Sequence, residues 1–372
     1  MNVYEFRRQQ FYEWMDREGI ALVMFEDTEG RRDPSLRWMT GHPGDALLFL
    51  SADQRSILVP WDINMADLLA NADMLIPYAE FQRQPVEALR AAAYYFKIPL
   101  GSRIEIPPVT PYPLFLKYIE GIADFDILCQ DGSAHAKAAE LRALKDGDEQ
   151  DLYRKASAIT NEIIELLEKK VRAGVLKTEV ETALFIEAEG RKRGCEGMGF
   201  ETLAAGPERS FGIHAFPTYT GGAFATQGLS ILDFGLNYFG YTTDVTLTFA
   251  REPLSKQQEK MLTLTEKAYY LALSLVKDGA SARDIAAAVD RFFSKSRKVM
   301  PHALGHGIGF EAHEEPFLRN RADNVRILKP GMIFTLEPGL YDPLHGGCRL
   351  ENDILLTGAG AEVLTTARII RL

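Results

Sequence analysis

One segment constrains the fold of this chain more than any other, because it predicts a β-hairpin that carries two aspartates. Residues 229–249 have the composition of two strands joined by a turn at Asn237–Gly240. If Asn237 pairs with Gly240, Asp233 lies directly opposite Asp244, with Cβ atoms about 5 Å apart. Two carboxylates that close among apolar neighbours would repel each other, and a cation between them removes the repulsion. The segment alone is equally compatible with an exposed hairpin whose aspartates face water.

Three later segments supply the same kinds of side chain. His306 lies in a glycine-rich run, Glu337 ends an apolar strand-like run, and Glu351 lies in a further predicted strand over residues 346–356. Taken singly, each is more often a solvated charge or a loop histidine. Together, four carboxylates and one imidazole suit two ions such as Mn²⁺, Co²⁺, Fe²⁺ or Zn²⁺. Two such ions about 3.5–4 Å apart can activate water and polarise a carbonyl.

The length of 372 residues favours two domains. Helix-like and strand-like segments alternate near the N-terminus, which predicts a small α/β domain. These segments are helices at 6–17 and 87–96 and strands at 20–25, 46–51, 56–60 and 103–106. We place the boundary near residue 130, giving domains 1–130 and 131–372. In the second domain we expect helices at 149–173, 178–194, 256–278 and 281–296, alternating with strands.

Composition excludes several classes of protein. A formal net charge of −10 disfavours nucleic acid as a partner, because phosphate binding needs a basic surface. Three cysteines (Cys129, Cys195, Cys348) make no disulfide framework and suggest a reducing compartment. The N-terminus lacks the apolar core of a signal peptide, and no apolar run approaches the ~18 residues that span a bilayer. We therefore expect a cytoplasmic protein that binds neither membrane nor nucleic acid.

At these residues the sequence resembles the metallopeptidase family of prolidase, aminopeptidase P and methionine aminopeptidase, whose creatinase branch keeps the fold without the metal. The family motifs appear here in matching order and spacing, as Asp233 and Asp244, Gly305-His306-Gly307-Ile308-Gly309 with His313-Glu314, Glu337-Pro338-Gly339, and Arg349-Leu350-Glu351. The resemblance is strong over residues 150–372. It extends more weakly to the N-terminal domain, where residues 36–41 look like a family segment.

The resemblance implies an α/β (α+β) protein, with a pita-bread catalytic domain and a smaller creatinase-like α/β N-terminal domain. It also implies two divalent metal ions (Mn, Co, Zn or Fe). Asp233 would bind one ion, His306 and Glu337 would bind the other, and Asp244 and Glu351 would bridge them.

The implied activity is cleavage of the N-terminal peptide bond of Xaa-Pro di- or oligopeptides by a metal-bridging hydroxide, as in an Xaa-Pro dipeptidase or aminopeptidase. Glu337 would move the proton, and His214 and His313 would stabilise the developing oxyanion. His302 and Arg349 would contact the substrate, together with His214 and His313. Relatives are commonly homodimers, which implies the same state here.

Some positions depart from the family pattern. Leu247 stands where the family often has arginine, and Asn352 stands where an acidic residue usually follows the last glutamate ligand. Arg319, Arg321 and Arg326 are all candidates for holding a dipeptide carboxylate. Two alternatives stay open: a metal-dependent relative that acts on a small molecule, such as a creatinase-like amidino hydrolase or a lyase, and a non-catalytic binding module.

Overall fold

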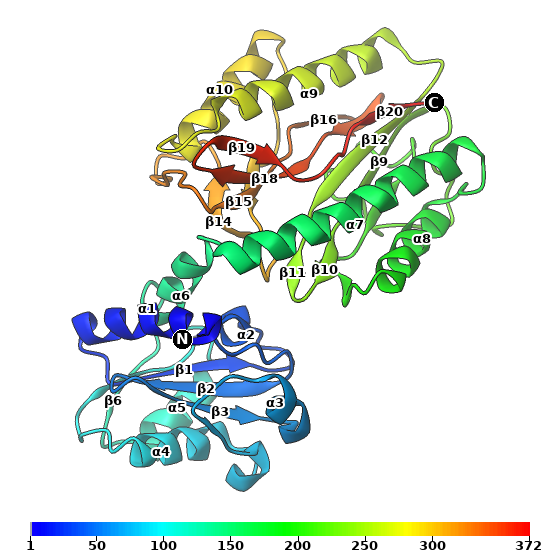
Figure 1. The fold of residues 1–372 in the computed structure, drawn as a ribbon. Helices are drawn as coiled ribbons and strands as arrows, with labels where there is room; N and C mark the ends of the chain where they lie inside the picture. Colours follow the sequence, from blue (N-terminus) through cyan, green and yellow to red (C-terminus); the bar gives the residue numbers. More distant parts are fainter. Residues whose placement is uncertain (1) are drawn as a thin grey trace. The chain divides into compact units, whose positions relative to one another are not determined.

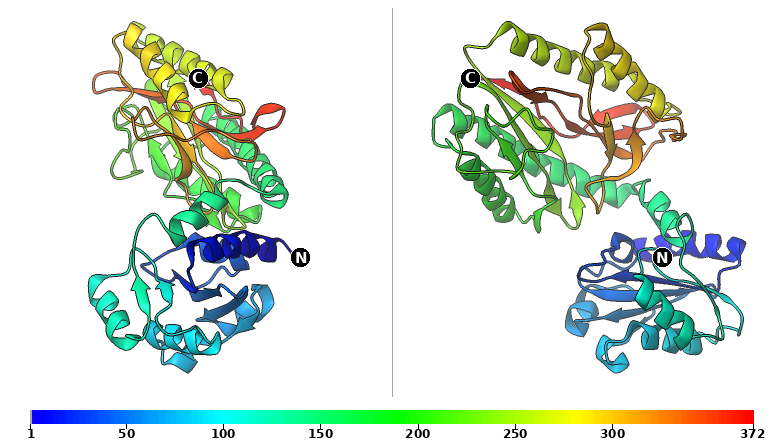
Figure 2. Two further views of the ribbon diagram at one scale, coloured as in Figure 1. Left: turned by 90° about the vertical axis from the view of Figure 1, so that its left-hand side faces the viewer. Right: turned by 180° about the vertical axis from the view of Figure 1, so that it is seen from behind.

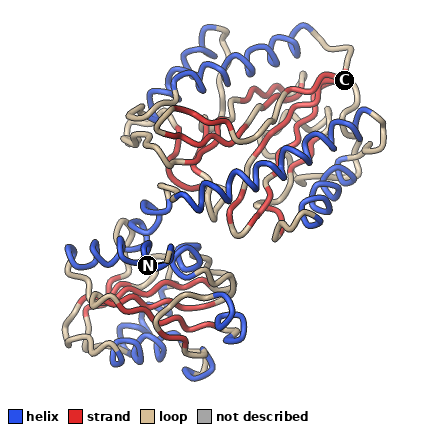
Figure 3. Tube along the Cα trace, in the orientation of Figure 1, coloured by secondary structure: helices blue, strands red, loops and turns tan. Residues whose placement is uncertain are grey.

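The computed structural model describes residues 2–372, and the chain divides into two compact units after Arg142. The division falls later than the boundary expected near residue 130. Helix α6 (Ala134–Arg142) accounts for the difference, because it contacts helices α1 and α2 of the first unit. Figure 3 shows helices and strands interleaved in both units. Among residues 2–372, no helix has the length and apolar composition needed to cross a membrane.

The first unit is built on a six-stranded sheet with the strand order β4-β3-β2-β1-β5-β6. Its strands are β1 (Leu22–Asp27), β2 (Ala46–Ser51), β3 (Arg55–Pro60), β4 (Met74–Leu75), β5 (Arg103–Glu105) and β6 (Asp126–Leu128). Its other helices are α1 (Val3–Glu18), α2 (Pro34–Thr40), α3 (Ile63–Leu69), η1 (Tyr78–Phe81), α4 (Pro85–Tyr95) and α5 (Tyr112–Gly121). Helices α1, α2 and α6 cover one face of the sheet, and α4 and α5 cover the other (Figure 1).

Local signals explain where helix α1 begins and ends. The Asn2 side chain accepts the Glu5 N–H, and the Glu5 carboxylate accepts the Asn2 N–H, which forms a capping box. Gly19 then ends the helix at a φ of 67°, in the left-handed region that glycine adopts without strain. The predicted small α/β unit is present.

The second unit combines four helices with curved, largely antiparallel sheets, whose orders are β20-β12-β9-β8, β14-β13-β15-β18-β19, β11-β10-β7 and β16-β17. In the described part of this unit, the one parallel pair is β12 with β20. The helices are α7 (Gly147–Arg172), α8 (Glu179–Lys192), α9 (Lys256–Leu275) and α10 (Ala282–Lys295). The first strands are β7 (Gly197–Met198), β8 (Leu203–Ala205), β9 (Gly228–Phe234), β10 (Leu236–Tyr238), β11 (Tyr241–Thr242), β12 (Val245–Arg251) and β13 (Gly305–Gly307). The remaining strands are β14 (Glu314–Leu318), β15 (Ile333–Leu336), β16 (Gly339–Asp342), β17 (Gly346–Arg349), β18 (Asn352–Thr357), β19 (Gly360–Val363) and β20 (Ile369–Arg371).

Helices cover the outer faces of these sheets, with α7 and α8 lying along one side and α9 and α10 along the other (Figure 2). One large apolar core joins helices and strands, and Leu232 and Phe234 of β9 belong to it. Successive side chains of a strand point to opposite faces, so Asp233 points away from this core. Polar side chains such as that of Asp233 can therefore come together on the inner face of the sheets.

The expected hairpin is present, but its predicted register is wrong. Tyr238 pairs with Tyr241, so Phe239 and Gly240 form a two-residue turn, and Asp233 lies opposite Thr246. Both turn residues have positive φ, which a type I′ turn requires, so Gly240 belongs inside the turn and not on a strand. The shift is an even number of residues. An even shift leaves every side chain on its predicted face of the hairpin. Asp233 and Asp244 therefore still lie on the same face.

The single strand expected over residues 346–356 is also wrong, because it is two strands in different sheets. Strand β17 pairs with β16, whereas β18 pairs with β15 and β19. Glu351 lies between them, and its N–H donates to the Thr246 carbonyl at 3.2 Å. This isolated β-bridge joins Glu351, in the gap between β17 and β18, to strand β12.

Candidate functional site

One pocket of about 170 Å³ in the second unit gathers all of the predicted site residues except His302. It is lined by Phe200, Glu201, Leu203, His214, Thr218, Asp233, Asp244, His306, His313, Glu337, Arg349 and Glu351. These residues come from segments more than a hundred positions apart in the chain. No sequence signal marked the four lining residues Phe200, Glu201, Leu203 and Thr218.

His306 lies on strand β13, with its ring close to the carboxylates of Asp244 and Glu337. The Nε2 atom of His306 lies 3.7 Å from an Asp244 oxygen and 3.6 Å from a Glu337 oxygen. Its Nδ1 atom donates to the Gly307 carbonyl at 3.2 Å, which leaves the Nε2 lone pair free. Burial, together with the nearby His313, lowers the pKa of His306 to about 3. His306 is therefore a neutral imidazole with the nitrogen of a metal ligand turned to the carboxylates.

The glycines beside His306 have a packing role. A Cβ atom on Gly305 would lie 2.0 Å from the Thr335 carbonyl oxygen, and one on Gly307 would lie 2.1 Å from that of Glu315. Strand β13 is thus pressed between β14 and β15, and neither glycine can carry a side chain. The contacts that require these glycines are with the neighbouring strands.

The four carboxylates lie together with little positive charge, Asp244 and Glu351 buried and Asp233 and Glu337 partly buried. Burial raises the pKa of Asp244 well above its usual range, and the charges of Glu351 and Asp233 raise it further. Burial and Glu351 raise the pKa of Glu337 in the same way. Burial, with Asp233, raises the pKa of Glu351 to about 7. Like charges this close are unfavourable without a compensating cation.

The donor set fits a divalent metal. Ligand atoms of Asp244, His306 and Glu351 all lie within 4.8 Å of one another. One oxygen of Asp233 (Oδ1) and one of Glu351 (Oε1) are buried without a hydrogen-bond partner among residues 2–372. Buried oxygens without a donor, next to a neutral imidazole nitrogen, are what a metal ion would satisfy.

Arg349 is the one buried cation that touches these acids in the described part of the second unit. It donates to Asp233 at 2.5 Å, to the Tyr341 hydroxyl at 2.8 Å and to the Thr246 hydroxyl at 2.9 Å. Thr246 in turn donates to Glu351 at 2.6 Å. Arg349 therefore orients Asp233 while lining the pocket. Thr246 could have been inferred from its place two residues after Asp244 on the same strand face, but no signal marked Tyr341.

The three other predicted histidines occupy different positions. His214 and His313 line the pocket, and the His313 ring centroid lies 4.1 Å from that of His306. Burial lowers the pKa of His313, so its ring is neutral. His302 is not among the lining residues. Its Nε2 atom bonds the Tyr341 hydroxyl at 3.0 Å, and its Nδ1 atom lies 3.7 Å from Glu337.

The three arginines considered for a substrate carboxylate do not line the pocket. The Arg319 guanidinium lies 5.2 Å from the centre of the Phe317 ring. Arg321 pairs with Asp323, and Arg326 pairs with Glu315.

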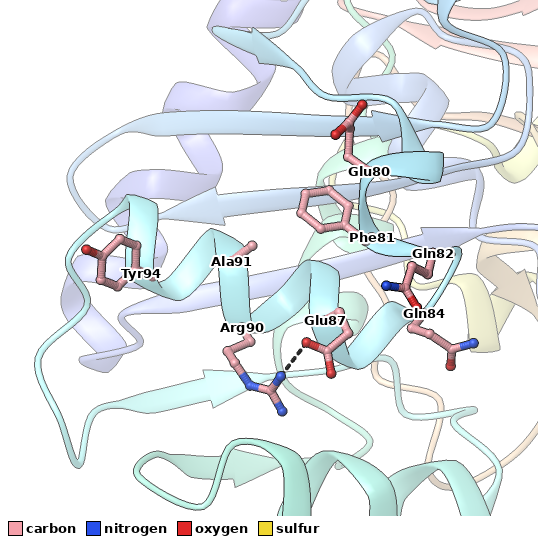
Figure 4. Close-up of a pocket in the computed structure, with 8 residues that line it drawn as sticks. All are labelled: Glu80, Phe81, Gln82, Gln84, Glu87, Arg90, Ala91 and Tyr94. Carbon is pink, nitrogen blue, oxygen red and sulfur yellow. Dashed lines mark hydrogen bonds and ion pairs between the residues drawn. The ribbon is translucent and has the colours of Figure 1, made fainter.

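The first unit has a larger and more open hollow of about 630 Å³ along helix α4 (Figure 4). Its one cation, Arg90, pairs with Glu87 and donates to the Gly121 carbonyl. Its other polar lining residues are the exposed Glu80 and two glutamines, Gln82 and Gln84. The hollow therefore lacks the crowded buried carboxylates of the pocket in the second unit.

Known proteins are similar to this chain in sequence. Residues 151–358 match the model of metallopeptidase family M24, and the chain belongs to this family. An uncharacterised peptidase of Methanocaldococcus jannaschii is 33% identical over 257 residues, which cover 68% of this chain and 70% of that protein. An uncharacterised peptidase of Staphylococcus aureus is 32% identical over 239 residues, which cover 63% of this chain and 66% of that protein. The match thus spans about two thirds of the length of these relatives.

Solved structures match over nearly the whole chain. A prolidase from Thermococcus sibiricus superposes with a TM-score of 0.84 at 25% identity, covering 100% of both chains. An Xaa-Pro dipeptidase from Bacillus anthracis superposes with a TM-score of 0.85 at 23% identity, covering 99% of this chain and 100% of that one. The predicted family and the pita-bread fold are confirmed.

Proposed function

We propose that this chain is a dinuclear-metal peptidase that cleaves the N-terminal peptide bond of Xaa-Pro di- or oligopeptides. The observation that carries the proposal is the convergence of four carboxylates, two of them buried and two partly buried, and the neutral His306 on one pocket, in a chain of a metallopeptidase family. The prolidase and Xaa-Pro dipeptidase among the matching structures favour proline as the second residue.

In this proposal Asp233 would hold one metal ion, His306 and Glu337 would hold the other, and Asp244 and Glu351 would contribute to holding both. When bound, the ions would polarise the scissile carbonyl and lower the pKa of a coordinated water toward neutrality. Manganese, cobalt, zinc and iron all suit these ligands. The short distances from His306 to Asp244 and Glu337 support this assignment.

The protein's own groups would move the proton and bind the oxyanion. Glu337 takes the proton of the attacking water and passes it to the leaving nitrogen. His214 and His313 donate hydrogen bonds to the carbonyl oxygen as negative charge develops, each worth about 2.7–4 kcal/mol. Arg349 lines the pocket and is proposed to contact the substrate. His302 lies outside the lining, so we propose that it acts through Tyr341 and Glu337.

One series of assays tests the proposal. Metal would be removed with a chelator and Mn²⁺, Co²⁺ or Zn²⁺ added back. Hydrolysis of Ala-Pro, Ala-Pro-Ala and the control Ala-Ala would then be followed together with bound metal. We expect metal-dependent cleavage of the bond before proline and slower cleavage of Ala-Ala. Equal cleavage of Ala-Ala would refute the preference for proline. No cleavage of any peptide with two ions bound would favour a small-molecule amide as substrate.

The homodimer implied by the family resemblance is also part of this proposal. Static light scattering of the purified protein measures the mass directly. A mass of twice 41.6 kDa supports the dimer, and a mass of 41.6 kDa contradicts it.

A further inference from the structure

Asp353 is a buried carboxylate that neither lines the pocket nor enters the proposed reaction. It is fully buried on strand β18, opposite Thr335 of β15. Its two oxygens lie 3.1 and 3.3 Å from the backbone nitrogen of Asp244, and they accept that N–H. No arginine or lysine in residues 2–372 pairs with it.

The Asp244 N–H takes its acceptor from a side chain at a point where neither β11 nor β12 continues. Thr243 and Asp244 lie between β11 and β12 and belong to neither strand. The Thr243 N–H still donates across the hairpin, to the Leu236 carbonyl at 3.0 Å. The next N–H, that of Asp244, has the Asp353 side chain as its acceptor. A side chain therefore replaces the main-chain carbonyl that a continuous ladder would supply.

A second bond ties the same two segments together. The Glu351 N–H donates to the Thr246 carbonyl at 3.2 Å, two residues beyond Asp244. Glu351 and Asp353 are themselves two residues apart. These two hydrogen bonds thus hold residues 244–246, at the start of β12, against residues 351–353, at the start of β18.

We propose that Asp353 is a positioning residue, which fixes the main chain of Asp244 so that the carboxylates of Asp244 and Glu351 can share a metal ion. The inference rests on the proposed function, since it takes these two acids as metal ligands. Asp353 itself touches neither metal nor substrate. Its effect is on the geometry of the ligand pair, and loss of its hydrogen bond leaves the Asp244 backbone free to move.

The test is calorimetric titration of the metal-free protein with Mn²⁺ alone. Asp353→Ala removes the acceptor and is expected to weaken Mn²⁺ binding about 10–100-fold, as removal of outer partners of metal ligands typically does. Asp353→Asn keeps an oxygen that can accept the N–H and is expected to bind within a few fold of wild type. If the alanine variant does not fold, Asp353→Ser replaces it with a shorter polar side chain.

A matched control separates positioning from general loss of stability. Ser230 is also fully buried, and its hydroxyl accepts a backbone N–H, that of Ala225, at 3.1 Å. Ser230→Ala is expected to lower thermal stability but leave Mn²⁺ affinity unchanged. Equal loss of affinity in Ser230→Ala would overturn the inference, and so would wild-type affinity in Asp353→Ala.

The same titration separates this inference from the proposed function. Absence of Mn²⁺ binding by the wild-type protein overturns both. Weakened binding in Asp353→Ala, in a protein that cleaves no peptide, supports the positioning role and refutes only the peptidase.

Discussion

Glu105, a buried acid of the first unit, and the acids of the pocket in the second unit differ in their partners. In the first unit, Glu105 is buried, but it accepts hydrogen bonds from the Ser133 hydroxyl at 2.6 Å and the Ala134 N–H at 3.0 Å. In the second unit, Asp244 and Glu351 are equally buried, but the charged groups that act on Asp244 are other acids, among them Glu351 and Asp233. Both units therefore contain buried acids. The acids of the candidate site differ because their negative charges and acceptor oxygens have too few partners within the described residues of the protein.

This difference indicates where ligand binding contributes to stability. An acid with its own donors is part of the fold, because its interactions are complete without any ligand. The clustered acids of the pocket have fewer donors than acceptor oxygens, because one oxygen of Asp233 and one of Glu351 have no hydrogen-bond partner among residues 2–372, and a bound cation would complete them. The three predictions below test the contrast, from the largest expected effect to the smallest.

Replacing a central ligand should abolish function without unfolding the chain. Asp244→Ala is expected to lose bound metal and to reduce peptide hydrolysis by more than about a hundredfold, since even outer partners of metal ligands cost 10–100-fold. Metal content by mass spectrometry and hydrolysis of Ala-Pro are the measurements.

The matched change in the first unit is Glu105→Gln, which should leave metal content unchanged. Full hydrolytic activity in Asp244→Ala would show that the metal assignment is wrong. Loss of metal in Glu105→Gln would show that the two units do not differ as described.

Neutralising one acid should have opposite effects on stability in the two units. In the metal-free protein at pH 8, Glu351→Gln removes one of the crowded charges and should raise the free energy of unfolding by about 1 kcal/mol. Glu105→Gln loses an acceptor at the start of α6 and should lower it by a similar amount. Urea unfolding of the metal-free proteins measures both. A loss of stability in metal-free Glu351→Gln would contradict the view that the acids repel.

The smallest expected effect is a pH dependence in the first unit. Burial raises the pKa of Asp27 to about 6 from its ordinary 3.8, although Arg32 opposes the shift. Between these pH values the folded state binds more protons than the unfolded state, so this group's contribution to stability increases as pH falls from about 6 toward 3.8. Relative to Asp27→Asn, wild type should gain on the order of 1 kcal/mol across that window. Urea unfolding at several pH values measures it, and parallel curves for the two proteins would refute it.

Much of the fold could be predicted from the sequence, because its signals are local. Helix α7 begins where Asp146 forms a capping box with Glu149, at the interruption that the sequence shows. The alternation of side chains along β9 could be predicted from the sequence, and it places Asp233 on the face that points away from the core. The residues of the pocket were found because their types and spacing match a known family.

Other features depend on contacts between distant segments and have no local signal. The hairpin register depended on which residues adopt positive φ, and Gly240 was assigned to the wrong side of the turn. The break at Glu351 exists because its N–H pairs with Thr246 of a distant strand. The role of Asp353 likewise requires knowing that β18 lies against the start of β12.

The glycines of strand β13 have a consequence for how such sequences are interpreted. Gly305 and Gly307 are required by the strands on either side, and this requirement does not involve His306 or any acid. A descendant that had lost every metal ligand would still need both glycines in order to fold. The glycine pair is thus a signature of architecture, and only the acids that accompany it report on chemistry.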